Sequence, residues 1–251
     1  MYKQDLHIHT YFSFDATPTF EEYAIKAIED NVSVLCFTDH IECTEIYNTF
    51  ATFDWARRRE EFETVRAKYG KQVKLLLGVE FGEPHYHPKE YNFVLAQDFD
   101  MIIGSVHYPA DVIVSGKSLN ESISDATYRI TKEMVTEGGF DVLGHLDFPK
   151  RFVQGFVEDI DKSNEVFQLC VKHNIVPEVN TASVARSGLP ETMPPIRIMP
   201  LYADAGGKYV TINSDSHATN TLCALTVETR RELDSRLKLC YFEKRKICVV
   251  E

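Results

Sequence analysis

The sequence predicts an α/β protein in which a parallel β-sheet closes, or nearly closes, into a barrel. Segments typical of strands and helices alternate along all 251 residues, which implies right-handed βαβ units and parallel strands. About seven such units follow one another without a linker, a low-complexity tract or a change in composition. A chain of this length suits a single barrel, and we expect one domain over residues 1–251.

The expected strands are short runs of apolar and β-branched residues, as in buried parallel strands. The first surrounds the run Asp5-Leu6-His7-Ile8-His9-Thr10. Six more are expected at residues 34–38, 73–79, 101–106, 140–144, 175–180 and 208–213, and a short last strand near residues 247–250.

The expected helices are placed by their start and stop signals. Pro18 and the acidic residues Glu21 and Glu22 mark the beginning of a helix that runs to about residue 30. Gly70 ends a charged helix that begins at about residue 54. Further helices are expected at about residues 88–96, 122–136, 157–173, from the proline-rich stretch 193–200 to residue 205, and at 221–239. Residues 108–118 have the composition of a loop.

Charge and cysteine content bear on partners and compartment. A formal net charge of -11 argues against a broad surface for nucleic acid or anionic membranes, although a local pocket can still hold a phosphate. The six cysteines include no Cys-x-x-Cys pair, so we expect reduced thiols and a cytoplasmic protein. No apolar signal region precedes the first strand, and no run approaches membrane-spanning length. We therefore expect no membrane partner, and no pattern specifies an oligomeric state.

Histidines and carboxylates lie where the expected strands end. His7 and His9 share one face of the first strand, because side chains alternate along a strand. Buried imidazoles need partners, and a metal ion would serve both; hydrogen-bonded or surface histidines are the alternative. The later strands end at His40, Glu80, His107, His145, and the pair Asp215 and His217. Because functional groups of a barrel lie at the C-terminal ends of its strands, we predict a metal cluster there.

Taken in order, these motifs resemble the polymerase and histidinol phosphatase (PHP) family of metal-dependent phosphoesterases. The resemblance covers nearly the whole chain. It rests on Asp5-Leu6-His7-Ile8-His9-Thr10, Thr38-Asp39-His40, Gly78-Val79-Glu80, Gly104-Ser105-Val106-His107, Gly144-His145 and Asn213-Ser214-Asp215-Ser216-His217. It implies a distorted (β/α)7 barrel with a metal cluster at the C-terminal ends of the strands.

The resemblance also implies two or three divalent metal ions, which would be Zn, Mn or Fe. One ion would be held by His7, His9, Glu80 and Asp215. Glu80 would bridge to a second ion that is also held by His107 and His145, and a third would be held by Asp15, His40 and His217. Many relatives have histidine in place of Asp15; its carboxylate is a competent ligand, although an acidic loop residue can also be solvated. A hydroxide shared between metals would then attack the phosphate.

Four further residues are candidates for contacts with the substrate. Arg151 and Arg186 follow the fifth and sixth strands, where they could make bidentate phosphate contacts or lie on the surface. The loop after His107 and residues 178–183 resemble the histidinol-phosphatase branch, which favours phosphate contacts for both arginines. His85 and His87 lie just beyond the third strand, where they could contact the substrate or belong to an exposed loop.

Three functions are compatible with these residues. The resemblance favours a phosphatase for L-histidinol phosphate, a small-molecule phosphate monoester of histidine biosynthesis. A phosphoesterase or nuclease for nucleotides or nucleic-acid ends is an alternative, against which the acidic composition and the lack of a basic stripe argue. A non-catalytic metal-binding module is another, against which the full set of ligands argues. For the phosphatase, the expected catalytic residues are Glu80, Asp215, Arg151 and Arg186.

Overall fold

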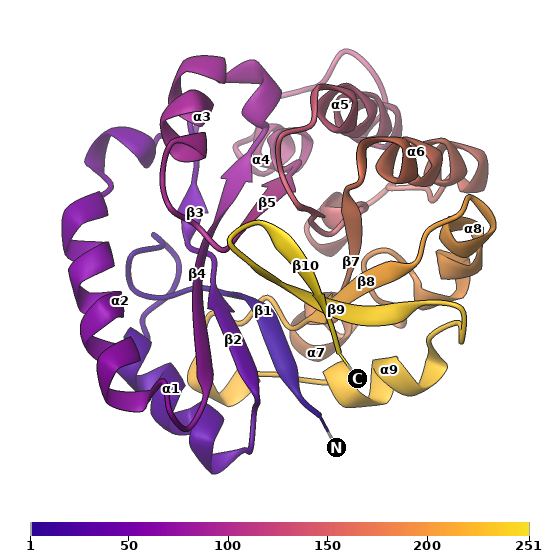
Figure 1. Ribbon diagram of the computed structural model, residues 1–251. Helices are drawn as coiled ribbons and strands as arrows, with labels where there is room; N and C mark the ends of the chain where they lie inside the picture. The colour runs from indigo at the N-terminus through magenta and orange to yellow at the C-terminus, as the bar shows by residue number, and fades with distance from the viewer. Residues whose placement is uncertain (1, 251) are drawn as a thin grey trace.

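A computed structural model describes residues 2–250 and shows a parallel β-sheet surrounded by helices (Figure 1). Within these residues seven parallel strands form the wall of a barrel. They are β1 (Gln4–Ile8), β2 (Val34–Phe37), β4 (Lys74–Gly82), β5 (Met101–Ser105), β6 (Val142–Leu143), β7 (Val176–Asn180) and β8 (Tyr209–Asn213). The remaining strands are β3 (His40–Ile41), which pairs with β4, and the antiparallel pair β9 (Lys238–Glu243) and β10 (Lys246–Val249).

The two ends of the seven-stranded sheet meet beyond the C-terminal ends of the strands. Ile8 forms an isolated parallel bridge with Ser216, and the His9 amide donates to the Ser216 carbonyl oxygen at 2.8 Å. At the opposite end, β9 is parallel to β8, and the Gln4 side chain donates to the Cys240 carbonyl oxygen at 2.8 Å. The β9–β10 hairpin therefore fills the gap beside β1, and it crosses the barrel in Figure 1. The predicted α/β fold, a distorted barrel, is confirmed.

The structure has nine α-helices between residues 2 and 250, and most of them cover the outside of the barrel (Figure 1). They are α1 (Phe20–Glu29), α2 (Trp55–Tyr69), α3 (Pro88–Leu95), α4 (Tyr108–Val114), α5 (Ile123–Glu137), α6 (Ile160–His173), α7 (Ala182–Ser187), α8 (Met199–Asp204) and α9 (Thr226–Glu232). Local signals explain several bounds. Thr19 and Glu22 form a capping box at the start of α1, and Asn174 ends α6 in the left-handed conformation.

The inner face of the barrel has an apolar layer and a polar layer. Leu76 on β4 belongs to a buried cluster inside the barrel, whereas its neighbour Leu77 belongs to the larger cluster that includes helix residues. Cys240 and Phe242 on β9 join the inner cluster and close this end of the barrel. Because side chains alternate along a strand, Glu80 faces inward like Leu76, but nearer the C-terminal end of β4.

The expectation of a loop at residues 108–118 is wrong, because Tyr108–Val114 form helix α4. Pro109 suits the first turn of a helix. The buried carboxylate of Glu83 accepts hydrogen bonds from the amides of His107 and Tyr108, at 2.5 and 2.8 Å. The Glu83 side chain, which is distant in the sequence, therefore caps the start of α4. The local sequence around α4 does not predict this contact.

The expectation of one long helix at residues 221–239 is also wrong. Helix α9 ends at Glu232, and a turn follows in which the Leu237 amide donates to the Asp234 carbonyl oxygen at 2.9 Å. The chain then continues as strand β9, which buries Cys240 and Phe242 inside the barrel. Burial in the end of the barrel overrides the local helical preference of this segment.

The structure also bears on the predicted state of the cysteines and on membrane-spanning segments. All six cysteines are free thiols in the part of the chain that the structure describes, and Cys36, Cys170 and Cys240 are buried. In the same residues, none of the helices combines the length and apolar character that a membrane crossing requires.

A buried arginine connects helix α2 to the strands. Arg58 Nε lies 2.6 Å from Asp39 Oδ2, and Arg58 Nη2 donates to the carbonyl oxygens of Phe37 and Gly78 at 3.2 and 2.9 Å. Asp39 Oδ1 accepts hydrogen bonds from the amide and the hydroxyl of Thr10, at 2.6 and 2.9 Å. This pair therefore fixes the segments that follow β1 and β2.

We expect Arg58→Met to lower the free energy of unfolding by about 3–5 kcal/mol, because the Asp39 carboxylate stays buried without its cation. Arg66→Met on the same helix is the control, since it removes an exposed ion pair with Glu63 and should cost about 1 kcal/mol or less. Chemical denaturation measures both values. Equal losses in the two variants would contradict the role of the buried pair.

Candidate metal centre

The carboxylate of Glu80 lies fully buried at the centre of the polar layer. Its Oε2 atom is 3.0 Å from both His7 Nε2 and His40 Nδ1. Its Oε1 atom is 2.9 Å from His145 Nε2 and 3.3 Å from His107 Nε2. These four histidines lie in or just after β1, β3, β6 and β5, so the ends of separate strands bring their rings to one carboxylate.

His9 and Asp215 extend the cluster on the side of β1 and β8. His9 Nε2 is 3.2 Å from Asp215 Oδ1 and 3.5 Å from Glu80 Oε2, and His7 Nε2 is 3.8 Å from Asp215 Oδ1. Asp215 has a φ of 51°, a conformation that is uncommon for residues other than glycine and that clusters at functional sites.

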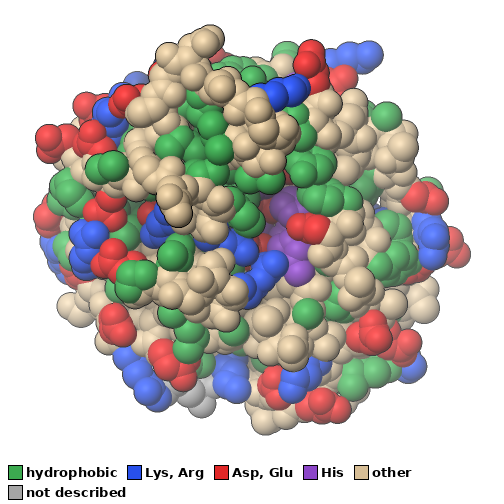
Figure 2. Space-filling model, turned by 180° about the vertical axis from the view of Figure 1, so that it is seen from behind, with side chains coloured by type: hydrophobic (Ala, Val, Ile, Leu, Met, Phe, Trp, Pro, Cys, Tyr) green, Lys and Arg blue, Asp and Glu red, His purple; other side chains and the backbone are tan. Residues whose placement is uncertain are grey.

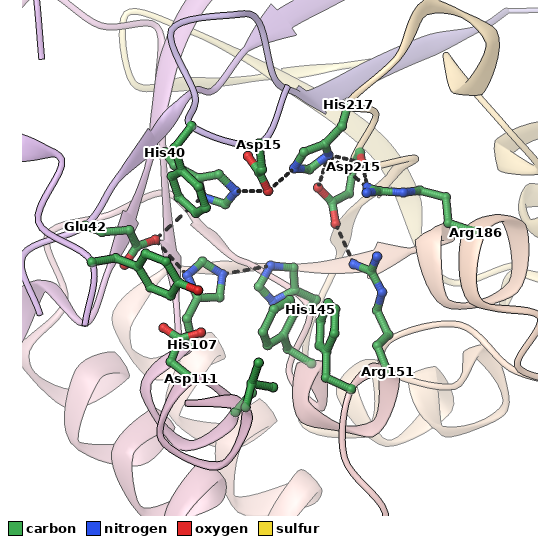
Figure 3. A pocket seen from close by; sticks show the side chains of 16 residues that line it. Asp15, His40, Glu42, His107, Asp111, His145, Arg151, Arg186, Asp215 and His217 are labelled. Carbon is green, nitrogen blue, oxygen red and sulfur yellow. Dashed lines mark hydrogen bonds and ion pairs between the residues drawn. The ribbon is translucent and has the colours of Figure 1, made fainter. Parts of the chain in front are cut away.

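Asp15 reaches the cluster from the loop between β1 and α1. Its Oδ2 atom is 3.0 Å from His217 Nε2 and 3.8 Å from His40 Nε2 (Figure 3). The rings of His40 and His217 both stack on His9, with centroids 4.2 and 4.1 Å apart. The structure thus brings together all nine residues expected as metal ligands, which are His7, His9, Asp15, His40, Glu80, His107, His145, Asp215 and His217.

Several buried polar atoms of the cluster have charged neighbours at ion-pair distance, but no partner in hydrogen-bonding geometry among the described residues. They include His7 Nε2, His9 Nε2, His40 Nδ1 and Glu80 Oε2. Each unsatisfied buried group costs about 1–3 kcal/mol. Groups such as His7, Glu80 and His145 offer ligand atoms that all lie within 4.8 Å of one another. Imidazole nitrogens and carboxylate oxygens suit Zn, Mn and Fe, so the donor set fits divalent metal ions.

Two carboxylates outside the ligand set hold ligand histidines by their other ring nitrogen. Glu178 Oε1 on β7 is 2.8 Å from His7 Nδ1, and Glu42 Oε1 is 2.8 Å from His107 Nδ1. Such contacts fix the orientation of a ring and leave its Nε2 atom for a metal.

Glu42 and Asp111 also lie at the site, although neither was expected there from the sequence. Glu42 stands two residues after His40, on a segment that continues β3. Residues two apart on a strand share a face, so this spacing could have indicated that Glu42 lies at the site. Asp111 stands four residues after His107, but the segment was expected to be a loop. Both residues line the cavity described below.

The pKa values of the histidines show how the cluster balances charge. Burial opposes protonation of His40, but the neighbouring carboxylates outweigh it and raise its pKa to about 10. In the same way, carboxylates overcome the effect of burial and raise the pKa values of His7 and His107 well above the ordinary value. Burial, together with the charge of nearby histidines, lowers the pKa of His9 to about 3. Protons on some rings thus offset the carboxylates, and metal binding would release them.

Arg151 and Arg186 both reach the ligand cluster. Arg151 Nη1 is 3.2 Å from Asp215 Oδ2, and only 6% of the Arg151 side chain is exposed. Arg186, on α7, donates from Nη1 to the Asp215 carbonyl oxygen at 2.7 Å, and this atom is 2.8 Å from His217 Nδ1. Figure 3 shows both guanidinium groups pointing toward Asp215. Both arginines therefore lie beside the cluster, and Arg151 is nearly buried whereas Arg186 is exposed to solvent.

A cavity of about 230 Å³ lies over the cluster. Besides ligands and the two arginines, its walls include Asp111, Glu42 and the apolar side chains of Phe14, Tyr47, Ala110, Val114, Phe148 and Phe152. Figure 2 views the molecule from the side opposite to Figure 1 and shows histidines within a hollow that has basic side chains beside it. The cavity thus opens at the end of the barrel opposite to the β9–β10 hairpin.

The structure does not bring His85 and His87 to this cavity. Glu83 has a φ of 43° and turns the chain after β4 into the short 3₁₀ helix Pro84–Tyr86. His85 then lies near Glu133 on α5, with 3.9 Å between His85 Nε2 and Glu133 Oε2. His87 precedes α3 and lines a separate surface hollow. The expectation that these two histidines contact the substrate is not supported, because the turn after β4 directs them elsewhere.

Comparison with known proteins points to one family. The PHP domain family matches residues 5–182. A probable histidinol-phosphatase from Clostridium acetobutylicum is 29% identical over 96% of this chain and 97% of its own length. The histidinol-phosphatase of Lactococcus lactis is 23% identical over 86% of this chain and 85% of its own.

Solved structures share the fold. The crystal structure of histidinol phosphate phosphatase from Lactococcus lactis, complexed with Zn, L-histidinol and phosphate, has a TM-score of 0.80 at 17% identity and covers 98% of both chains. A structure from Listeria monocytogenes has a TM-score of 0.70 at 21% identity over 87% of this chain and 97% of that chain. The family match extends from the first strand, which carries His7 and His9, to the start of α7. The chain therefore belongs to the PHP domain family.

Proposed function

We propose that the protein is a metal-dependent phosphatase that hydrolyses L-histidinol phosphate to L-histidinol and phosphate. The observation that carries this proposal is that nine candidate metal ligands form one cluster, and that six of them line a single cavity together with two arginines. The ligands suit metal-assisted hydrolysis, and the arginines suit a phosphate anion. The names of relatives that match 96% and 86% of the chain support the same substrate.

We infer that the cluster holds two or three divalent ions, which would be Zn, Mn or Fe. The first group of ligands is His7, His9, Glu80 and Asp215. The second is Glu80, His107 and His145, and the third is Asp15, His40 and His217. Bound ions supply Lewis acidity to the phosphoryl oxygens and make water a stronger nucleophile at neutral pH. Glu80 is shared by two groups, and its charge offsets the repulsion between two cations.

Arg151 and Arg186 would bind the non-bridging oxygens of the phosphate. Both guanidinium groups already contact Asp215, so they are oriented toward the place where the phosphate would lie. Their planar donors can form paired hydrogen bonds to two oxygens, which a lysine ammonium cannot.

Asp111 would bind the ammonium group of the substrate. Its side chain lines the cavity, and among the described residues no hydrogen bond or ion pair engages its carboxylate. Burial raises the pKa of Asp111 to about 6, so the carboxylate is largely ionised at neutral pH. An ionised carboxylate without a cation, in the same cavity as two arginines, suits a substrate with a phosphate at one end and an ammonium group nearby.

We also propose a cytoplasmic location. The free thiols include three buried ones, Cys36, Cys170 and Cys240. Thiols persist in reducing compartments, and the proposed substrate belongs to histidine biosynthesis.

A turnover screen tests the function. Purified protein loaded with Zn, Mn or Fe should release phosphate from histidinol phosphate faster than from other phosphomonoesters, nucleotides or short DNA. Preference for nucleotides or DNA would favour the nuclease alternative. Full metal content without turnover of any ester would favour a binding module.

We predict that Glu80→Gln loses bound metal as well as activity, because a neutral amide cannot offset two cations. Elemental analysis and phosphate release measure the two effects. Glu63→Gln, at an exposed position on α2, is the matched control and should leave both unchanged. Normal metal content with near-normal turnover in Glu80→Gln would refute the bridging role.

We predict that Arg151→Ala and Arg186→Ala each lower kcat/KM for histidinol phosphate by about 30-fold to 1000-fold, since a charged hydrogen bond to the phosphate is lost. Metal content should stay close to that of the parent. Lysine at either position should restore only part of the activity. Arg129→Ala, on the exposed face of α5, serves as the control. If both alanine variants stay within about twofold of the parent, the arginines do not bind phosphate.

A further inference from the structure

A series of nearly parallel rings leads from the ligand cluster to the mouth of the cavity. His9 and His40 stack with centroids 4.2 Å apart and an interplanar angle of 26°. Phe14 stacks on His40 at 5.4 Å and 29°, and on Tyr47 at 5.1 Å and 12°. Phe14 and Tyr47 both line the cavity, and they are 54% and 37% exposed. This side of the cavity is therefore aromatic from the cluster to the solvent.

A second pair of rings lies on the side of Arg151. Phe148 and Phe152 have centroids 5.0 Å apart, and the guanidinium carbon of Arg151 lies 4.9 Å from the Phe152 ring centre. Phe152 is 50% exposed and also lines the cavity. Figure 3 shows Arg151 and His40 on different sides of the ligand cluster, so aromatic walls flank the space over it.

The position of Phe14 is fixed by the residues on both sides of it. The Ser13 hydroxyl accepts a hydrogen bond from the His40 amide at 3.0 Å, and Asp15 lies 3.0 Å from His217 Nε2. A ring that is held in place but exposed offers apolar surface to a ligand and loses little conformational freedom when the ligand binds. Exposed apolar surface at the mouth of a cavity is typical of a binding site.

We propose that these two aromatic walls bind a planar ring carried by the phosphate ester, so that the site selects aromatic or heteroaromatic phosphate monoesters over aliphatic ones. The inference rests on the proposed function for the phosphate end of the site. With the phosphate at the arginines and the ammonium group at Asp111, the rest of the substrate lies beside these rings. An imidazole can stack on Phe14 or Tyr47, and its protonated form adds a cation–π attraction, whereas an alkyl chain offers neither.

Calorimetry with two phosphonates tests the subsite without any catalytic step. Benzylphosphonate carries a ring and ethylphosphonate does not, and both present the same anionic group to the metal-loaded protein. The parent should bind benzylphosphonate more tightly. Phe14→Ala and Tyr47→Ala should each reduce this preference by about threefold to tenfold, because one stacking partner is lost, while affinity for ethylphosphonate stays unchanged.

The matched variants separate stacking from disturbance of the loop. Phe14→Tyr and Tyr47→Phe keep a ring at each position and should keep the preference for benzylphosphonate. Phe93→Ala removes an exposed ring outside the cavity and should change neither affinity. The proposal is overturned if both alanine variants keep the preference within about twofold, or if they weaken both phosphonates equally.

The test of the aromatic walls is independent of the test of the proposed substrate. If the parent does not hydrolyse histidinol phosphate, the proposed function fails, but the ratio of the two phosphonate affinities still reports on the aromatic walls. If histidinol phosphate is hydrolysed and the ratio is insensitive to Phe14 and Tyr47, the function stands and the subsite is refuted.

Discussion

The polar half of the barrel depends on a single buried carboxylate, that of Glu80. Four histidine nitrogens lie within 3.3 Å of its two oxygens, and each belongs to a different strand end. Imidazoles and carboxylates in a layer shielded from water are stable only if their charges cancel, with protons or with metal cations. The C-terminal ends of the strands must therefore lie level with Glu80 on β4. The position of the site thus depends on the register of the strands in the sheet.

Residues outside the ligand set maintain this arrangement. Glu42 and Glu178 orient ligand rings, and the Arg58–Asp39 pair fixes the backbone that leads to His40. Glycine at position 82 has a steric reason, because a Cβ atom there would overlap the Glu42 carboxylate. Contacts between strands thus support the metal centre. Loss of one supporting residue should therefore displace, through the backbone, a ligand that this residue does not itself touch.

The alternation of strands and helices, and the ligands at strand ends, could be predicted from the sequence because both follow local patterns. Helix α4 and strand β9 could not, since Glu83 caps the first and the barrel interior buries the second, and both effects come from distant segments. The same reason applies to His85 and His87. Their spacing resembles that of His7 and His9, but the backbone turn at Glu83 decides where they point.

The closed end of the barrel, where Cys240 and Phe242 fill the interior, has a kinetic consequence. Because the ligand cluster lies beneath the cavity, the proposed substrate would enter with its phosphate first. After hydrolysis, the alcohol would lie between the phosphate and the mouth, and it would have to diffuse out before the phosphate could follow. Inorganic phosphate would then be the last product to leave, and it would compete with incoming substrate for the empty enzyme.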